Sequence, residues 1–444
     1  MTDNEKTTIR AQLSSVFRPS APIDSYALFG GRKQQIDMLM GAILQTGQHA
    51  ILYGERGIGK TSLVRVLAEV LSSAGHRTVH SDTLNCDSTD DFSSLWHRAL
   101  RELTFKMRVK SGRPNAYEAP RDENKETEGL LPKIVSPDDV RRALTTFTGR
   151  GAVIIFDEFD RITNREAKTL MADTIKNLSD HATDATLVIV GVAKSVLELI
   201  SEHRSIDRAI IEVPMPRLSP DELTQIISKG FANLKIKMSE PVRQKIIILS
   251  HGLPHYTHLL SLEAGKAAIE RDALIIEDQD LMAALCQVVK SKHSVANEYI
   301  RAVSSAHQAS THKMTLLACA LAKPDIQGYF QASDIAATMV ALFGGDGAAR
   351  NIAKHLSEFI TVKRGNVLER EGSLRQFKFR FSNPLVQPYT IISSLSEGLI
   401  ADQKVWDLQR ELENPPEIII ASQPSSDVAP ALSSVPSLLY PMDV

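Results

Sequence analysis

The chain has 444 residues, a formal net charge of -2 and a hydrophobic fraction of 43%. This length allows two or three domains with buried cores, and the near-neutral charge means that any nucleic-acid surface must be local. No stretch is long and apolar enough to span a membrane, and the first residues lack the features of a secretory signal. Three widely spaced cysteines, Cys86, Cys286 and Cys319, show no metal-ligand spacing. We therefore expect a soluble, cytoplasmic protein with free thiols and no membrane partner.

The N-terminal part of the chain divides near residue 26. Residues 1–26 are polar with scattered prolines and are predicted to form a flexible arm. The segment Leu28–Arg32 then precedes a helix whose apolar residues recur at helical spacing. These apolar residues are Ile36, Leu39, Met40 and Ile43.

A glycine-rich loop with the sequence GERGIGKT follows the apolar run Ala50–Tyr53 and precedes a helical pattern. This order predicts a phosphate-binding loop, in which backbone N–H groups surround the phosphates at a helix N-terminus. Lys60 is placed to reach the β- and γ-phosphates, and Thr61 offers a hydroxyl to Mg²⁺. ATP and Mg²⁺ are thus the predicted ligands. The residues expected to bind the nucleotide here are Gly54, Glu55, Arg56, Gly57, Ile58, Gly59, Lys60, Thr61 and Ser62.

A second apolar run, Gly151–Phe156, ends in the acidic pair Asp157 and Glu158. An unbroken apolar run is typical of a central parallel strand, which would deliver the pair to the carboxyl edge of the sheet. We predict that Asp157 binds the metal together with Thr61. Glu158 is predicted to be the catalytic group that polarises a water for attack on the γ-phosphate.

Further strand patterns occur at residues 78–81, 186–191 and 209–213. With the two strands already described they give five strands that alternate with helices, which predicts an α/β fold with a five-stranded parallel sheet and helices on both faces. Residues 108–130 are charged and carry Gly, Pro and Asn, so we expect an inserted loop there. A capping box at Ser219–Glu222 then opens a run of helices, the predicted lid.

These motifs together resemble the AAA+ ATPases, near the boundary between the origin-recognition/initiator group and the STAND signalling ATPases. The resemblance covers about residues 27 to 290. Phe29–Arg32 resembles the family's entry motif beside the adenine, and Asp157–Asp160 resembles the Walker B sequence of the initiator group. Asp207-Arg208 lies where that group places its arginine finger, and Gly252-Leu253-Pro254 resembles an element of STAND lids.

The resemblance implies further site residues. Arg208 would be a catalytic arginine that reaches the nucleotide of a neighbouring subunit, so it implies a homo-oligomer; the alternative is an ordinary surface arginine near a helix end. Gly252 and Pro254 would contact the nucleotide. Two departures from the family stand out: Ser195 is the nearest polar residue to the tip of the fourth strand, and His255 stands where a lid arginine is expected. Hydrolysis is therefore expected to be slow, and the nucleotide to act mainly as a switch.

The block from Thr311 to Ser394 has the pattern of a winged helix, with three helices followed by two strands. The second strand alternates so that Phe377, Phe379 and Phe381 would be buried and the intervening Lys378 and Arg380 exposed. Between residues 354 and 380 there are seven basic and three acidic residues, a local surplus of +4. This predicts a modest surface for duplex DNA. The alternative is a winged helix that contacts proteins or clamps the nucleotide domain.

The predicted domains are an N-terminal arm (1–26), a P-loop core (27–215), a helical lid (216–300), a winged helix (310–395) and a disordered tail (410–444) that could carry a motif for a protein partner. Two functions fit this organisation. The first is an ATP-hydrolysing, DNA-associated assembly or loader machine. The second is a STAND-type switch controlled by ATP and ADP, which acts through protein partners.

Overall fold

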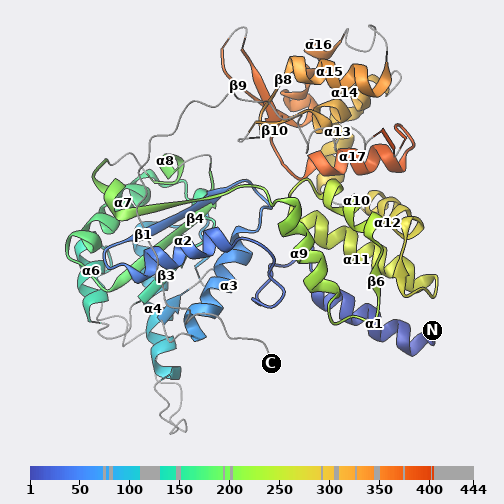
Figure 1. Ribbon diagram of the computed structural model, residues 1–444. Helices are drawn as coiled ribbons and strands as arrows, with labels where there is room; N and C mark the ends of the chain where they lie inside the picture. The colour runs from blue at the N-terminus through green and yellow to red at the C-terminus, as the bar shows by residue number, and fades with distance from the viewer. Residues whose placement is uncertain are drawn as a thin grey trace, which may run out of the picture.

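The computed structural model describes residues 1–73, 77–79, 84–110, 131–146, 152–193, 196–200, 204–291, 294–304, 310–325, 328–344, 351–373, 376–401 and 403–404 (Figure 1). Ser195 and the tail predicted at 410–444 lie outside these residues. No helix within the described ranges is long and apolar enough to cross a membrane.

The core contains the predicted five-stranded parallel sheet, with strand order β2-β3-β4-β1-β5. Every described pairing within it is parallel, so the carboxyl ends of all five strands lie at one edge. The five strands are β1 (His49–Gly54), β2 (Arg77–Val79), β3 (Ala152–Phe156), β4 (Ala185–Val192) and β5 (Ile210–Met215). The α/β fold class is thereby confirmed.

Helices cover both faces of this sheet because its strands alternate their apolar side chains between two cores. Ile154 and Phe156 belong to a core with α4, α6 and α7, whereas Val153 and Ile155 belong to a core with α2 and α3. The helices of this domain are α2 (Lys33–Leu44), α3 (Lys60–Ser73), α4 (Phe92–Lys110), α6 (Pro137–Thr145), α7 (Arg165–Asp180) and α8 (Val196–Leu199), with short 3₁₀ turns η1 (Phe159–Arg161) and η2 (Arg204–Ala209).

Helix α4 extends to Lys110, so the insertion predicted at 108–130 begins three residues too early. Its remaining residues, 111–130, lie outside the described part of the chain.

The prediction of a flexible arm at residues 1–26 is wrong for its first half. Residues Asp3–Val16 form helix α1, which begins with a capping box between Thr2 and Glu5. The helix packs on α11 of the lid and buries Ile9 and Leu13 completely or nearly so. The physical reason is tertiary: an amphipathic helix this short is stabilised mainly by the face that it buries.

The predicted lid is helical, with α9 (Pro220–Phe231), α10 (Glu240–Ser250), α11 (Pro254–Glu270) and α12 (Asp278–Lys290), and with a two-stranded sheet of β6 (Lys237–Met238) and β7 (Ile275–Ile276). The C-terminal elements follow as α13 (Ser294–Val303), α14 (Ser310–Leu321), β8 (Phe330–Gln331), α15 (Ala332–Phe343), α16 (Ile352–Phe359), η3 (Val362–Arg364), β9 (Leu368–Glu371), β10 (Lys378–Phe381) and α17 (Val386–Ser396).

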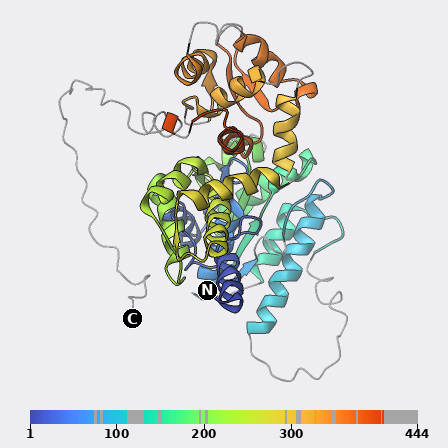
Figure 2. The same ribbon diagram turned by 90° about the vertical axis from the view of Figure 1, so that its right-hand side faces the viewer.

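The C-terminal helices and the antiparallel sheet β8-β10-β9 come in the order expected for a winged helix, an assignment that stays a prediction. Phe379 and Phe381 are buried as expected, but Phe377 precedes strand β10 and is only half-buried. One hydrophobic core runs through α1, the lid and the C-terminal elements. Figures 1 and 2 show the C-terminal elements at one end of the lid and α1 at the other, with the P-loop core beside them.

Candidate nucleotide site

A cavity of about 320 Å³ lies at the carboxyl edge of the sheet. Its lining comes from four parts of the chain: the P-loop core, the segment after α1, the lid, and the start of α17. Of the residues predicted to bind nucleotide, those that line the cavity are Arg56, Gly57, Ile58, Gly59, Lys60, Thr61, Ser62, Asp157 and Pro254. The structure thus brings the two main motifs and the first residue of α11 together.

Three predicted residues do not line this cavity. Gly54 ends strand β1, and the Glu55 carboxylate faces Arg217 instead. Gly252 packs against Arg217 and Leu218 in the linker between core and lid. Nucleotide contact by these three residues therefore stays a prediction.

The P-loop connects β1 directly to α3. Gly57 and Gly59 have φ angles of 80° and 96°, in the left-handed region that favours glycine. Lys60 is 8% exposed, and its Nζ donates to the carbonyl oxygens of Gly54 at 3.0 Å and Glu55 at 2.7 Å. Burial lowers the pKa of Lys60 to about 8. The loop's own carbonyls thus hold the ammonium group where phosphates are expected.

Thr61 and Asp157 meet as predicted. The Thr61 hydroxyl donates to Asp157 Oδ2 at 2.7 Å, and the Glu158 N–H donates to Asp157 Oδ1 at 2.8 Å. Asp157 is 2% exposed, and burial raises the pKa of its carboxyl. A hydroxyl and a carboxylate are hard oxygen donors of the kind that Mg²⁺ prefers, and such a site is commonly completed by waters and phosphates. These two residues therefore fit a magnesium ion, which when bound would neutralise phosphate charge.

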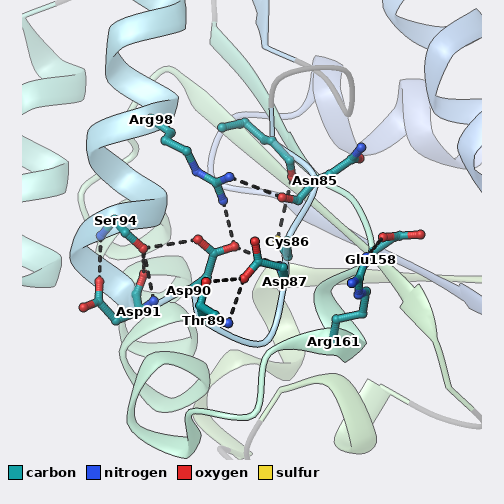
Figure 3. A network of polar contacts seen from close by, with 11 residues as sticks. Asn85, Cys86, Asp87, Thr89, Asp90, Asp91, Ser94, Arg98, Glu158 and Arg161 are labelled. Atoms are coloured by element: carbon teal, nitrogen blue, oxygen red, sulfur yellow. Dashed lines mark hydrogen bonds and ion pairs between the residues drawn. The ribbon is translucent and has the colours of Figure 1, made fainter.

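Glu158 lies beside a cation that the sequence did not indicate. The residue adopts a left-handed conformation with φ of 55°, and its carboxylate pairs with Arg161 at 2.7 Å (Figure 3). Both side chains are about half exposed. Glu158 also lines the cavity, and the Arg161 contact involves its Oε2 atom.

A polar network fixes the neighbouring loop to the end of β3 (Figure 3). The Cys86 N–H donates to the Asp157 carbonyl oxygen at 2.9 Å. Within the loop, buried Asp90 pairs with Arg98 at 2.8 Å, and the Asp87 carboxylate accepts from Thr89, which lowers the pKa of Asp87. The network ties the Asp157 backbone to the segment that contains Asn85 and Cys86.

The tip of β4 is tied to the acidic motif by Asp160. The Val192 N–H donates to Asp160 Oδ1 at 2.8 Å, and both residues line the cavity. The predicted sensor, Ser195, lies outside the described residues. Asp160 is therefore the polar side chain that the structure places at this strand end.

Arg208 lies at the opposite edge of the sheet from the cavity. Strand β5 begins beside His49, the first residue of β1, and ends beside Gly54, a rise of about 17–20 Å over six residues. Arg208 is 76% exposed and pairs with Asp180, the last residue of α7, at 2.6 Å. It cannot serve the nucleotide of its own chain, so its role as a finger depends on a neighbouring subunit, and the alternative of a surface arginine stays open.

Arg217 was missed at the sequence level. Its guanidinium bonds Glu55 Oε2 at 3.0 Å in the P-loop and Gln387 Oε1 at 2.8 Å in α17. Nearby, Leu385 packs against Gly57, and the Tyr256 hydroxyl donates to the Leu385 carbonyl oxygen at 2.6 Å. The C-terminal elements thus reach the P-loop itself. Single residues far apart in sequence carry this contact, so no local pattern indicates it.

The segment after α1 closes the other end of the cavity. Residues 18–23 line it, and the Ile23 N–H donates to the Ser62 hydroxyl at 3.1 Å. Phe29, Gly30 and Arg32 of the predicted entry motif line the cavity as well, and buried Arg32 donates to the Ile58 carbonyl oxygen at 3.1 Å. The place of this motif beside an adenine stays a prediction. Burial lowers the pKa of Arg32 to about 10, so it remains charged.

Comparison with known proteins finds one family model and several solved structures to which the chain is similar. Among solved structures, the chain is similar to Cdc6p from Pyrobaculum aerophilum, with 16% identity, a TM-score of 0.43, and coverage of 87% of this chain and 99% of that one. It is also similar to the ORC1 protein of Aeropyrum pernix in complex with DNA, with 15% identity, a TM-score of 0.43, and coverage of 90% of this chain and 98% of that one. A third similar structure is the RuvB Holliday junction branch migration motor of Thermotoga maritima, with 15% identity, a TM-score of 0.39, and coverage of 78% of this chain and 92% of that one. No curated protein matches the sequence.

Residues 28–190 match the family model of the AAA ATPase domain. This range contains the P-loop, the Thr61–Asp157 contact and four of the five strands, and β5 completes the sheet. This part of the chain is therefore similar to the AAA ATPase domain, and the P-loop and the acidic motif both lie within it.

Proposed function

We propose that this protein is a cytoplasmic AAA+ ATPase of the initiator or loader type, which couples ATP binding and slow hydrolysis to self-association on duplex DNA. The observation that carries the proposal is the arrangement of Lys60, Thr61, Asp157 and Glu158 around one cavity. This donor set suits phosphoryl transfer, in which catalysis consists mainly of positioning and charge stabilisation.

In this proposal the residues have separate tasks. Lys60 and the first N–H groups of α3 hold the phosphates. Glu158 holds the attacking water and accepts its proton. Its half-exposed ion pair with Arg161 contributes only about 0–1 kcal/mol, so opening this pair does not limit turnover. Arg208 acts on the nucleotide of a neighbouring subunit, which makes turnover depend on assembly.

Support for a DNA surface comes from exposed cations near the C-terminal sheet. Lys354, Lys363 and Arg370 are exposed. Lys378 pairs with Asp325 at 2.9 Å, but both side chains are at least a third exposed, and such surface pairs contribute only about 0–1 kcal/mol. A DNA phosphate can therefore replace Asp325 as the partner of Lys378.

Two measurements test the proposal. Glu158→Gln should bind ATP as the wild type does but lose turnover, because an amide cannot accept the proton. The double variant Lys363→Glu/Lys378→Glu should weaken binding of every duplex tested and flatten its salt dependence, while ATP affinity stays unchanged. Lys176→Glu, a single charge reversal at an exposed position of α7, is the control.

The outcomes separate the candidate functions. Wild-type turnover in Glu158→Gln would overturn the catalytic assignment. A wild-type protein that retains no DNA at low salt, and that stays monomeric with ADP bound, would favour the nucleotide-controlled switch over the DNA machine.

A further inference from the structure

Asp160 brings to the cavity a carboxylate that the tasks described above do not use. It belongs to the 3₁₀ turn η1, directly after the acidic motif, and it lines the cavity. Phe159 and Ile162, on either side of it in the sequence, are buried in the core with α4 and α7. The position of the Asp160 backbone is therefore fixed by the core of the sheet domain.

The two carboxylate oxygens of Asp160 have different surroundings. Oδ1 accepts a hydrogen bond from the Val192 N–H at the tip of β4, at 2.8 Å. Oδ2 accepts no hydrogen bond from the described residues, and it keeps accessible surface, because Asp160 is only half-buried and Oδ2 is not among the buried atoms that lack a partner. Oδ1 thus fixes the side chain, and Oδ2 remains available to a molecule in the cavity.

The tip of β4 leaves room for this carboxylate. Gly191 lines the cavity beside Val192, and a Cβ atom at this position would lie only 3.0 Å from Asp160 Oδ1. The strand itself therefore presents no side chain at this point. Asp160, from the neighbouring turn, occupies the space that a side chain of the strand would need.

Asp160 lies at the part of the cavity that the P-loop forms. Burial lowers the pKa of Lys60, and the Asp160 charge opposes this change more strongly than the charge of Asp157, Glu55 or Glu158 does. Because the field of a carboxylate falls with distance, Asp160 lies close to the ammonium group that is expected to hold the phosphates.

The chemistry of Oδ2 limits which ligand atom it can meet. An ionised carboxylate accepts hydrogen bonds and cannot donate them. The phosphate oxygens of ATP are acceptors too and carry charge of the same sign, so they are unsuitable partners. The hydrogen-bond donor that hydrolysis requires beside the phosphates is the attacking water.

We propose that Asp160 positions the attacking water, with Oδ2 accepting a hydrogen bond from one O–H group while Glu158 faces the other. The water oxygen bonds to the γ-phosphorus, the bond from this phosphorus to the bridging oxygen breaks, and ADP leaves with the electron pair. Glu158 accepts the released proton, and Asp160 keeps its charge throughout. The inference rests on the proposed function, since it assumes that ATP hydrolysis is the reaction of this cavity.

Asp160→Asn separates this task from a structural one. The Val192 N–H directs the amide oxygen to the place of Oδ1, so the bond to β4 is kept while an NH₂ donor replaces the acceptor Oδ2. At saturating ATP and Mg²⁺, kcat of the full chain should fall about 10- to 100-fold, the range for a hydrogen bond to a charged group. KM and the equilibrium affinity for ATP should stay close to the wild-type values.

The matched control is Asp173→Asn, which makes the same change at a half-buried carboxylate of α7 that does not line the cavity. This variant should keep the wild-type kcat. Its failure to do so would show that the loss in Asp160→Asn is not specific to the water.

Other results would overturn the inference. An unchanged kcat in Asp160→Asn would show that Oδ2 does not hold the water. An equal loss of ATP affinity and turnover would assign Asp160 to holding the tip of β4 alone. A higher Mg²⁺ requirement with wild-type kcat at saturation would place Oδ2 on a metal-bound water instead. If the wild type itself fails to hydrolyse ATP, the proposed function fails, an outcome that is evident before any variant is measured.

Discussion

Replacing Phe17 by alanine should release helix α1 from the lid. Phe17 is 1% exposed, its ring lies 4.7 Å from that of Phe231, and it fills the space that a side chain at Gly230 would need. Burial of Ile9, Leu13 and Phe17 contributes about 1.5–3 kcal/mol each, or roughly 4.5–9 kcal/mol before the cost of ordering the helix. Truncation of a buried phenylalanine removes about 3–5 kcal/mol. Most of the docking free energy of α1 is therefore lost.

Hydrogen exchange measures this release directly. Since each 1.4 kcal/mol corresponds to a factor of ten, amides of α1 should exchange about 100- to 4000-fold faster in Phe17→Ala. ATP affinity should fall as well, because residues 18–23, which follow α1, line the cavity. Ser14→Ala, an exposed position on the same helix, is the control. Unchanged exchange of α1 in Phe17→Ala would refute the reasoning that this face holds the helix.

Two further predictions concern the P-loop. The pKa of Lys60 is about 8 without nucleotide, and phosphate anions raise it, so ATP binding favours the protonated form. Affinity should therefore be full below pH 8 and fall by up to about tenfold per pH unit above it, whereas Lys60→Arg should lack this decline in calorimetric titrations. Arg217→Ala should speed release of a fluorescent ATP analogue several-fold, because Glu55 and Gln387 lose the cation that joins them. An unchanged release rate would show that this contact is not coupled to the nucleotide.

The meeting of the two motifs at the candidate nucleotide site could be predicted from sequence because its signals are local. Apolar runs identify β1 and β3, and the residues that directly follow each run carry the chemistry. Parallel strands end at one edge, so Thr61 and Asp157 had to meet even though 96 positions separate them. Strand logic does not reach Pro254. Its contact with the nucleotide was predicted only from the family resemblance.

Contacts between distant segments could not be predicted in this way. Thr2 and Glu5 form a capping box, and Ile9, Leu13 and Phe17 recur every four residues, so a helical pattern was present in the predicted arm. The pattern does not indicate which part of the chain covers the apolar face of this helix. That surface is supplied by α11, about 250 positions later in the sequence. Arg161 and Arg217 were missed for a related reason: a single arginine acquires a role only from the carboxylate that folding places beside it.

The C-terminal cations show how charge counted along a sequence differs from charge on a surface. The count gave a surplus of +4, but Arg380 pairs with Glu369 and lies over the Tyr329 ring, while Arg364 bonds backbone carbonyl oxygens of Ala302 and Ser304. These two arginines therefore stabilise the fold more than they offer charge to a ligand. Lys354, Lys363 and Arg370 remain exposed, and in the proposed function a DNA phosphate replaces Asp325 beside Lys378. Duplex binding should therefore involve about four phosphates, with a slope of about −3.6 in a plot of log affinity against log salt concentration. A slope of about −2.7 would mean that only the three exposed cations meet phosphates and that the Lys378–Asp325 pair stays closed on DNA.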